Sequence, residues 1–423
     1  MALTLRAGVA ALLGVPVGEP RQLTGGASRE TWAFPGERPA VLRRDPPGHG
    51  DAARMRAEVA CLRAAAAAGV PVPAVLAAGD TAPGIEAPFI LTEHVAGEAL
   101  PRKLLRDPGF DAVRPQLACE LGRVLGAIHG TPVETLGMLD DTDPLDAIEA
   151  VYRDLRDPRP AVEAALHWLR EHRPADRPRA LVHGDFRLGN LLVDGTGVRA
   201  VLDWELAHLG NPIEDLGWLC VRAWRFGAQP PVAGVGTREQ LLDGYAAVTG
   251  FRPDPAELHW WEAYGTLRWL VLSRFQAERH FSGAEPALEL AAIGRRVCES
   301  EYDLLAVLGL LVDVPAPDPV PYAAPLHGRP TLPELLDLVA GTLADDLTVA
   351  TDRERYLLRI CVSLLRTAGR ELAAGDGVAV PEAELAERLR TGAARYRDDA
   401  VRHAMSAAVL ARVRVVNPRH AGE

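Results

Sequence analysis

Residues 183–205 read HGDFRLGNLLVDGTGVRAVLDWE, and this stretch decides the fold of the chain. Asp185 and Asn190 lie on a predicted loop that follows the apolar strand RALV. The segments LLV, DGTG and VRAVL then predict a hairpin with a tight turn. Because the hairpin leads the chain back, we expect Asp203 to lie beside Asn190.

The chemical types of these side chains predict a site for phosphoryl transfer. An amide oxygen of Asn190 and a carboxylate of Asp203 suit Mg²⁺, a hard cation that takes a few protein oxygens and shares the rest with phosphates. Asp185 is not needed for the metal and can accept a proton from an attacking hydroxyl. Arg187 adds a guanidinium that suits phosphate oxygens. A base, two metal ligands and a cation are the working parts of a kinase.

On these residues the sequence resembles the aminoglycoside phosphotransferase and choline-kinase type of small-molecule kinase. HGDFRLGN matches the catalytic loop of that family, LDWE matches its metal aspartate, and LGNPIEDLGWL is similar to its usual continuation. The segment LDWELAHLGNPIEDLGW looks most like the sequences of the branch found fused to acyl-CoA dehydrogenases. The resemblance covers about residues 20–310 and implies ATP and Mg²⁺ as cofactors.

The resemblance also implies a role for each matching residue. Asp185 would be the catalytic base, with Arg187 beside it, Asn190 and Asp203 would be the metal ligands, and Asp215 would brace the catalytic loop. The residues that it assigns to the nucleotide are Gly25, Gly26 and Ser28 in the loop over the phosphates, Arg43 as the phosphate anchor, Glu58 as its partner on a helix, and Glu93 with Val95 in the adenine hinge.

Two features depart from the family pattern. The phosphate loop reads GGAS in place of GxGxxG, and Arg43 stands where most kinases place a lysine. A guanidinium can hold phosphates and pair with Glu58, but it is not interchangeable with an ammonium. Because Lys103 is the only lysine among 46 basic residues, we interpret Arg43 as the substitute anchor. The departures also motivate an alternative, a nucleotide-binding pseudokinase that acts through a protein partner of the C-terminal helices.

Hydrophobic periodicity along the 423 residues predicts the fold class. The first part mixes strand-like segments (22–34, 39–45, 87–97) with one helix at 51–69. We expect an α+β, two-lobed protein-kinase-like fold followed by a helical bundle. The predicted parts are an N-lobe with nucleotide loop and hinge at 1–97, a helical C-lobe with the catalytic loop at 98–311, a proline-rich linker at 312–330 and a helical bundle of unknown role at 331–423.

Composition excludes several classes of function. A net charge of −11 argues against a nucleic-acid partner or an acidic membrane surface, since both need a concentrated basic face. No apolar stretch is long enough to cross a membrane. Five widely spaced cysteines without a CxxC pair are typical of free thiols, so we expect a cytoplasmic protein.

The spacing of the aspartates limits the size of the acceptor. Eleven residues separate Asp203 from Asp215, too few for the long segment on which protein kinases dock peptides, so a small-molecule hydroxyl acceptor is favoured. The resemblance favours a hydroxyacyl-CoA, and the arginines of 260–283 argue against a cationic aminoglycoside. A metal-dependent hydrolase resting on His183 and Asp185 is a weaker alternative.

Three further interpretations concern single residues and the last helices. His183 is expected to support the backbone of its loop, and His129 to be a packing histidine. The charge runs of the C-terminal helices are interpreted as solvated faces. These helices are compatible with a lid, a homo-oligomer contact or a site for a protein partner.

Overall fold

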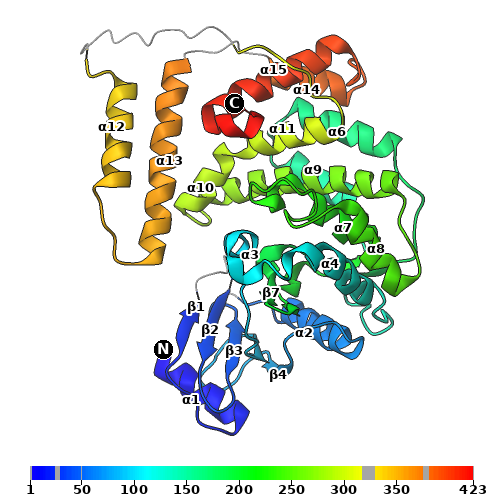
Figure 1. The fold of residues 1–423 in the computed structure, drawn as a ribbon, viewed down its shortest axis with the longest axis vertical. Coiled ribbons are helices and arrows are strands. Elements are labelled where there is room, and N and C mark those ends of the chain that lie inside the picture. The colour runs from blue at the N-terminus through cyan, green and yellow to red at the C-terminus, as the bar shows by residue number, and fades with distance from the viewer. Residues whose placement is uncertain (1, 24–28, 49, 317–328, 375–380, 423) are drawn as a thin grey trace. The chain divides into compact units, whose positions relative to one another are not determined.

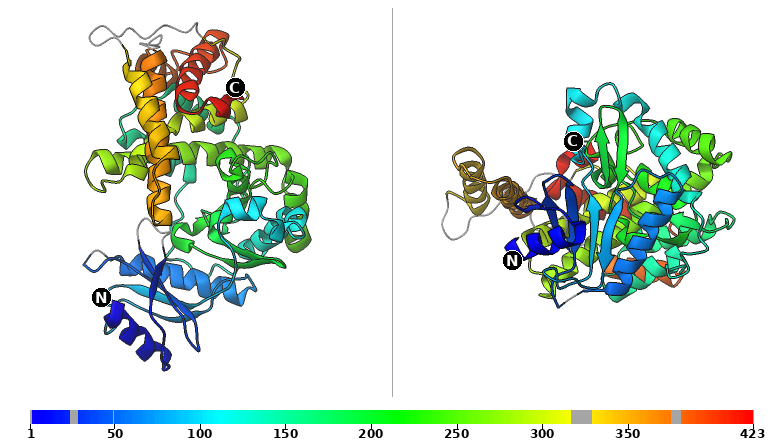
Figure 2. Two further views of the ribbon diagram at one scale, coloured as in Figure 1. Left: turned by 60° about the vertical axis from the view of Figure 1, so that its left-hand side comes forward. Right: turned by 90° about the horizontal axis from the view of Figure 1, so that it is seen from below.

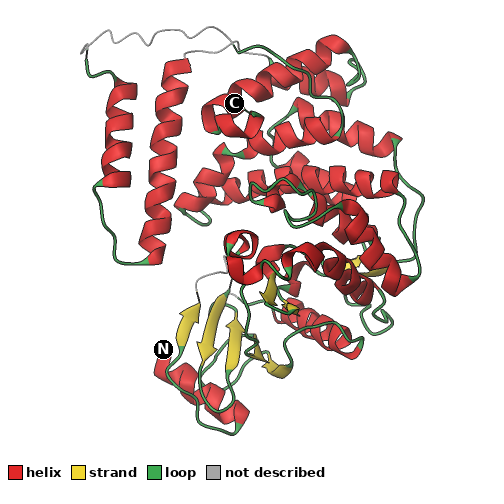
Figure 3. Ribbon diagram, in the orientation of Figure 1, coloured by secondary structure: helices red, strands yellow, loops and turns green. Residues whose placement is uncertain are grey.

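The computed structural model describes residues 2–23, 29–48, 50–316, 329–374 and 381–422. By compactness the chain divides into two units, Met1–Asp143 with Pro174–Glu262, and Pro144–Arg173 with Ala263–Glu423. This division does not coincide with the boundaries at 97 and 311 expected from the sequence, and those boundaries stay a prediction. Figure 3 shows that the strands belong to the first unit, whereas the second unit is helical.

The first unit carries the sheet and the predicted site. Its elements are α1 (Ala2–Leu13), β1 (Arg21–Leu23), β2 (Glu30–Phe34), β3 (Ala40–Arg44), α2 (Ala52–Ala67), β4 (Val75–Gly79), β5 (Phe89–Glu93), α3 (Pro101–Arg106), η1 (Pro108–Phe110), α4 (Arg114–His129), β6 (Ala180–Val182), η2 (Leu188–Asn190), β7 (Leu191–Asp194), β8 (Gly197–Val201), η3 (Trp204–Leu206), β9 (His208–Gly210), α7 (Ile213–Cys220), η4 (Arg222–Arg225) and α8 (Arg238–Thr249).

Five antiparallel strands form the main sheet in the order β1-β2-β3-β5-β4 (Figure 1). Successive side chains of a strand point to opposite faces. On β3, Ala40 and Leu42 are fully buried in a core with Leu5 and Val9 of α1. Arg43 therefore points to the other face, where α2 packs. The alternation of one short strand thus delivers a cation to the face that carries the site.

Helix α2 begins where the sequence predicts a start. Asp51 is the N-cap, and its carboxylate accepts the backbone N–H of Arg54 at 3.0 Å. The predicted helix at 51–69 corresponds to α2, and the predicted strands at 39–45 and 87–97 contain β3 and β5. Periodicity does not predict the short strands β4 and β9, because neither alternates between polar and apolar residues.

Two small strand pairs position the predicted catalytic loop. β7 and β8 form the predicted hairpin, and β6 pairs antiparallel with β9. The segment after the main sheet joins the hairpin, since Glu98 and Val193 exchange backbone hydrogen bonds of 2.8 and 3.0 Å. Residues 183–190 are therefore held at both ends by paired backbone.

The second unit consists of helices. They are α5 (Pro144–Asp154), α6 (Pro160–Glu171), α10 (Leu288–Arg295), α11 (Val297–Val307), α12 (Leu332–Asp345), α13 (Asp352–Ala374), α14 (Glu382–Arg390), α15 (Asp399–Val416) and η5 (Pro418–Ala421). Helix α9 (Pro255–Phe281) begins in the first unit and continues in the second. Figure 2 shows α12 and α13 side by side from two further directions.

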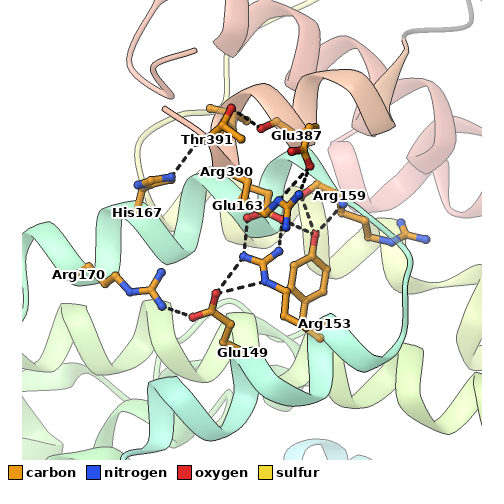
Figure 4. Close-up of polar contacts among 11 residues, drawn as sticks. Glu149, Arg153, Arg159, Glu163, His167, Arg170, Glu387, Arg390 and Thr391 are labelled. Carbon is orange, nitrogen blue, oxygen red and sulfur yellow. Dashed lines mark hydrogen bonds and ion pairs between the residues drawn. The ribbon is translucent and has the colours of Figure 1, made fainter. Parts of the chain in front are cut away.

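Ion pairs connect the helices of the second unit (Figure 4). Arg153 of α5 donates from Nη2 to Glu163 of α6 at 2.9 Å and also pairs with Glu149. His167 of α6 contacts the carbonyl oxygen of Leu389 in α14 through Nε2 at 2.9 Å. Helix α14 is therefore joined to α6 by a polar contact.

The cysteines and the helix lengths are two further properties of the described residues. All five cysteines are free thiols, and burial raises the pKa of Cys61 to about 12. Among the described helices, none combines the length and the apolar composition needed to cross a bilayer.

Candidate active site

Glycine at position 184 shapes the predicted catalytic loop. Gly184 has a φ of +79°, and a Cβ atom there would lie 2.3 Å from the carbonyl oxygen of Leu206. Only glycine satisfies both the left-handed backbone and the close approach. The glycine of the HGD sequence is therefore required by the backbone conformation of the loop.

The Asp185 carboxylate is held by three donors. Arg187 donates from Nε to both oxygens at 3.0 and 3.1 Å, and Asn190 donates from Nδ2 to Oδ2 at 2.7 Å. The indole Nε1–H of Trp218 donates to Oδ1 at 3.0 Å. The side chain remains 15% exposed. These contacts fix the orientation of the carboxylate and still leave it accessible to a ligand.

The contacts of Asn190 also settle which way its amide points. Nδ2 donates to the main-chain oxygen of Asp185 at 2.9 Å as well as to the carboxylate. Both partners are acceptors, so the NH₂ group must face them. The amide oxygen Oδ1 of Asn190 therefore points away from Asp185 and can serve as a cation ligand.

Asp203 follows the hairpin in an unusual backbone conformation. Its φ of 65° and ψ of 66° are left-handed, which is uncommon for a residue other than glycine. The N–H of Leu202 donates to the carbonyl oxygen of Asn190 at 2.8 Å, so the hairpin returns beside the loop. The Asp203 carboxylate is 35% exposed, and its Oδ1 accepts a hydrogen bond from Arg43 Nη2 at 2.9 Å. The two predicted metal ligands thus come from adjacent backbone segments.

Arg43 joins the sheet to the hairpin through Glu58 of α2. Its Nη1 pairs with Glu58 Oε1 at 2.5 Å, while Nη2 holds Asp203. The fork of a guanidinium can make both contacts at once, whereas an ammonium is a point charge. The predicted pair of Arg43 and Glu58 is therefore present, and Arg43 has Asp203 as a second acidic partner.

Glu58 has a second cationic partner, Arg29. The Glu58 side chain is 1% exposed, and its Oε2 pairs with Arg29 Nη1. Arg29 also donates from Nε to Asp45 at 3.0 Å. Burial by itself lowers the pKa of Arg29, but the charges of Glu58 and Asp45 outweigh it and raise the pKa. Two arginines therefore converge on the buried carboxylate of Glu58. One of them, Arg29, directly follows Ser28 of the predicted phosphate loop.

Asp215 holds the backbone of the catalytic loop. It is fully buried, and its two oxygens accept the backbone N–H groups of His183 at 2.7 Å and Gly184 at 2.9 Å. His129 contacts Asp215 through Nε2 at 3.2 Å. Burial raises the pKa of Asp215, but the contacts with His129 and His183 outweigh it, and the pKa lies below its ordinary value. This arrangement is the brace that the sequence suggests.

The ring of His183 is used by backbone groups on both sides. Nε2 lies 2.9 Å from the carbonyl oxygen of Leu202, and Nδ1 lies 3.2 Å from the backbone N–H of Asp185. A carbonyl only accepts and a backbone N–H only donates, so Nε2 is the donor of the first contact and Nδ1 the acceptor of the second. This contact pattern fits the expected supporting role and leaves no ring nitrogen for acid–base chemistry.

Of the other predicted nucleotide residues, the structure describes Glu93 and Val95. Glu93 ends β5, and its carboxylate accepts the N–H of Ala74 at 3.1 Å. Val95 lies two residues later in the predicted hinge. Gly25, Gly26 and Ser28 fall outside the described residues. The hinge and the phosphate loop stay predictions.

The donor set suits a hard cation with few protein ligands. No group of three or more His, Cys, Asp or Glu side chains able to hold a metal occurs among the described residues. Asn190 and Asp203 supply oxygen only, which is what Mg²⁺ takes when phosphates complete its shell. Near them, burial and the charge of Asp203 raise the pKa of Glu205.

Three contributors to this site are not found by sequence analysis. Arg29 follows the glycine loop without a motif of its own. Trp218 lies in the quoted LGNPIEDLGWL, but no spacing rule connects an indole to Asp185. His129, expected to be a packing histidine, contacts Asp215 and, at 3.2 Å, the hydroxyl of Tyr245.

Comparison with known sequences identifies the family of this region. Residues 19–261 match the phosphotransferase enzyme family, APH. Acyl-CoA dehydrogenase family member 10 of Mus musculus is 32% identical over 215 residues, which is 47% of this chain and 20% of the mouse protein. Family member 11 of Rattus norvegicus is 26% identical over 249 residues, 52% of this chain and 31% of the rat protein. The chain therefore spans less than a third of these relatives.

Solved structures also match this chain. A putative aminoglycoside phosphotransferase from Ralstonia eutropha has a TM-score of 0.58 at 22% identity and covers 73% of this chain and 98% of its own. A thermostable mutant of aminoglycoside phosphotransferase APH(4)-Ia, in ternary complex with AMP-PNP and hygromycin B, has a TM-score of 0.51 at 19% identity, with 73% and 98% covered. The predicted α+β kinase-like fold with extra C-terminal helices is thereby confirmed.

Proposed function

The chain belongs to the phosphotransferase enzyme family, and on that premise we propose that it transfers a phosphoryl group from ATP, with Mg²⁺, to a hydroxyl of a small metabolite. The observation that carries the proposal is the Asp185 carboxylate, held by Arg187, Asn190 and Trp218 while it remains accessible. A carboxylate so oriented can act as a general base toward a bound hydroxyl.

The residues present fit Mg²⁺ and a nucleotide. Asn190 Oδ1 is directed away from its own hydrogen-bond partners, and Asp203 is partly exposed, so both would hold the cation. Arg43 lies beside Asp203 and would anchor phosphates. Bound Mg²⁺-ATP supplies the γ-phosphoryl group and offsets the negative charge of the phosphates.

Side chains of the protein orient and deprotonate the acceptor. Asp185 orients the acceptor hydroxyl and takes its proton at one carboxylate oxygen. Arg187, whose guanidinium lies 5.1 Å from the ring centroid of Trp224, keeps positive charge beside that carboxylate. Asp215 holds the backbone of the loop so that Asp185 stays in position.

For the acceptor we propose a hydroxyacyl-CoA. The support is the similarity to two acyl-CoA dehydrogenase family members, whose names refer to acyl-CoA chemistry. A protein partner or a homo-oligomer contact through residues 331–423 belongs to the same proposal, as does a reducing, cytoplasmic location suited to five free thiols.

The decisive experiment measures ADP release from Mg-ATP with a panel of hydroxyacyl-CoAs, hydroxy acids, amino alcohols and aminoglycosides. We expect turnover with a hydroxyacyl-CoA that falls by at least about a thousandfold in Asp185→Asn, because the general base is lost. Glu205→Gln is the matched control, a neighbouring carboxylate outside the proposed catalytic set, and should retain turnover.

Two other outcomes would redirect the proposal. Turnover of a different acceptor class would keep the phosphotransferase and replace the hydroxyacyl-CoA. If no acceptor turns over while Mg-ATP still raises the melting temperature, the pseudokinase alternative gains, since nucleotide binding without transfer is what it predicts.

A further inference from the structure

A cavity of about 580 Å³ lies between the end of α12 and helix α13 in the second unit. Figure 1 shows the two helices running side by side as a hairpin. Four arginines of α13 line the cavity, and we call it the arginine groove: Arg355, Arg359, Arg366 and Arg370. No carboxylate occurs among its lining residues in the described part of the chain.

The four arginines share one face of α13. Their positions differ by 4, 11 and 15 residues from the first, which are helical repeats that return to the same side. At 1.5 Å of rise per residue they extend over about 22 Å of the helix. The rest of the wall is mostly apolar and consists of Ala344, Leu347, Val349, Leu358 and Val362, together with the hydroxyl-bearing Thr348 and Ser363. The groove therefore combines a row of cations with an apolar lining.

Two other charged residues of α13 form ion pairs with α10. Arg353 pairs with Glu289, and Glu371 pairs with Arg295 at 2.7 Å. By contrast, within the described residues no carboxylate lies within ion-pair distance of Arg359 or Arg366. Both residues are exposed to solvent.

Arg370 shows that the positive charge of the groove is only partly compensated. Its guanidinium donates to the carbonyl oxygens of Val415 at 2.6 Å and Val416 at 3.1 Å, which end helix α15. Carbonyls carry only partial charge. Burial and the neighbouring charge of Arg366 both lower the pKa of Arg370. An anion in the groove would remove this repulsion.

We propose that the arginine groove binds an alkyl phosphate, a phosphate ester that carries an apolar chain. Guanidinium groups bind phosphate oxygens bidentately, and the apolar wall suits a hydrocarbon segment. The volume lies within the range of about 300–1,000 Å³ of small-molecule sites. Lipids and acylated coenzymes share this chemistry. The site is separate from Asp185 in sequence and belongs to the other unit.

The test is calorimetric titration of the full chain with decyl phosphate below its micelle concentration, with saturating Mg-AMP-PNP present to occupy the nucleotide site. Inorganic phosphate and decanol are the comparison ligands. We expect decyl phosphate to bind at least about tenfold more tightly than either, since it alone satisfies both the arginines and the apolar wall. Asp185→Asn should bind it as the wild type does.

Matched variants test whether decyl phosphate binds in the arginine groove. Arg359→Gln with Arg366→Gln should weaken binding of decyl phosphate by at least about tenfold, because two phosphate donors are lost. Arg353→Gln, on the same helix but paired with Glu289, should bind within about twofold of the wild type. If circular dichroism shows that the glutamine variant is not folded, Arg359→Lys with Arg366→Lys replaces it, because this variant keeps the charge. It should bind decyl phosphate more weakly than the wild type.

Three outcomes would overturn the proposal. The first is equal binding of decyl phosphate by the wild type and the folded groove variants. The second is binding of inorganic phosphate as tightly as decyl phosphate, since the apolar wall would then have no role. The third is binding of poly-glutamate in place of decyl phosphate, which would make the groove a surface for an acidic protein segment.

Discussion

Glu58 accepts two guanidinium groups in almost complete burial, and their environments differ. The Arg29 side chain is 5% exposed and the Arg43 side chain is 25% exposed. Arg29 also holds Asp45, whereas Arg43 reaches Asp203 at the proposed metal site. At the scale of single residues, Arg29 is therefore structural, whereas Arg43 faces the proposed metal site.

This difference predicts that two matched variants affect stability and nucleotide binding to different extents. Arg29→Met should lower the free energy of unfolding by about 3 kcal/mol, because it leaves buried carboxylates with less compensation. Arg43→Met should lower it by about 1 kcal/mol, as for a partly exposed pair, and weaken Mg-AMP-PNP binding by at least about tenfold. Urea unfolding and calorimetry measure the two quantities.

The assignment of roles would be wrong under a reversed pattern. If Arg43→Met were the more destabilising variant and bound Mg-AMP-PNP with unchanged affinity, Arg43 would be the structural residue. Arg43→Lys is the informative intermediate, since its ammonium cannot span Glu58 and Asp203 as the fork does.

At the scale of elements, the catalytic loop depends on the backbone at Gly184. The loop lies between β6 and the β7–β8 hairpin, and its N–H groups at His183 and Gly184 are held by Asp215 of α7. The left-handed conformation of Gly184 lets the chain turn past Leu206. Local backbone geometry and a distant helix therefore determine the position of Asp185 together.

We expect Gly184→Ala to lower the free energy of unfolding by at least about 3 kcal/mol, from backbone strain and the clash with the Leu206 carbonyl. Gly195→Ala, in the turn of the β7–β8 hairpin, is the control, because no heavy atom lies within 4 Å of its added Cβ. That variant should stay within about 1 kcal/mol of the wild type. Urea unfolding of both variants checks the comparison, and equal stabilities would show that the loop relaxes around the methyl group.

At the scale of the whole molecule, the chain forms two compact units, and the proposed nucleotide site belongs entirely to the first. A ligand that binds one unit raises the stability of that unit by mass action, by about 2.7 kcal/mol at a hundred times its Kd. The alkyl phosphate proposed for the arginine groove would act on the other unit.

Differential scanning calorimetry should therefore resolve two transitions. Mg-AMP-PNP should raise the temperature of one, and decyl phosphate should raise the temperature of the other. Asp203→Asn should reduce the first effect only, because it removes a proposed metal ligand. A single transition that both ligands raise equally would show that α9, which is shared by the units, couples them into one cooperative structure.

The sequence by itself determined the fold class and much of the proposed site. Asp185, Arg187 and Asn190 fall within six consecutive residues. The segment DGTG predicts the turn of a hairpin that brings Asp203 back beside them. Short loops and tight turns bring such residues together by local rules. For this reason the catalytic loop is predictable from local spacing in the amino-acid sequence. The pair of Arg43 and Glu58 and the Asp215 brace are predicted only by the resemblance to the kinase family, since they connect segments that are distant in the chain.

Tertiary structure alone decided the contacts between residues that no local rule connects. Arg29 reaches Glu58 across 29 positions, and Trp218 reaches Asp185 across 33. On α13 the sequence shows arginines at helical spacing, but only the neighbouring helix determines which of them meet a glutamate. Arg353 has Glu289 of α10 beside it, whereas Arg359 and Arg366 line a cavity. Whether a charge is neutralised depends on what packs against it, and packing is a property of the folded chain.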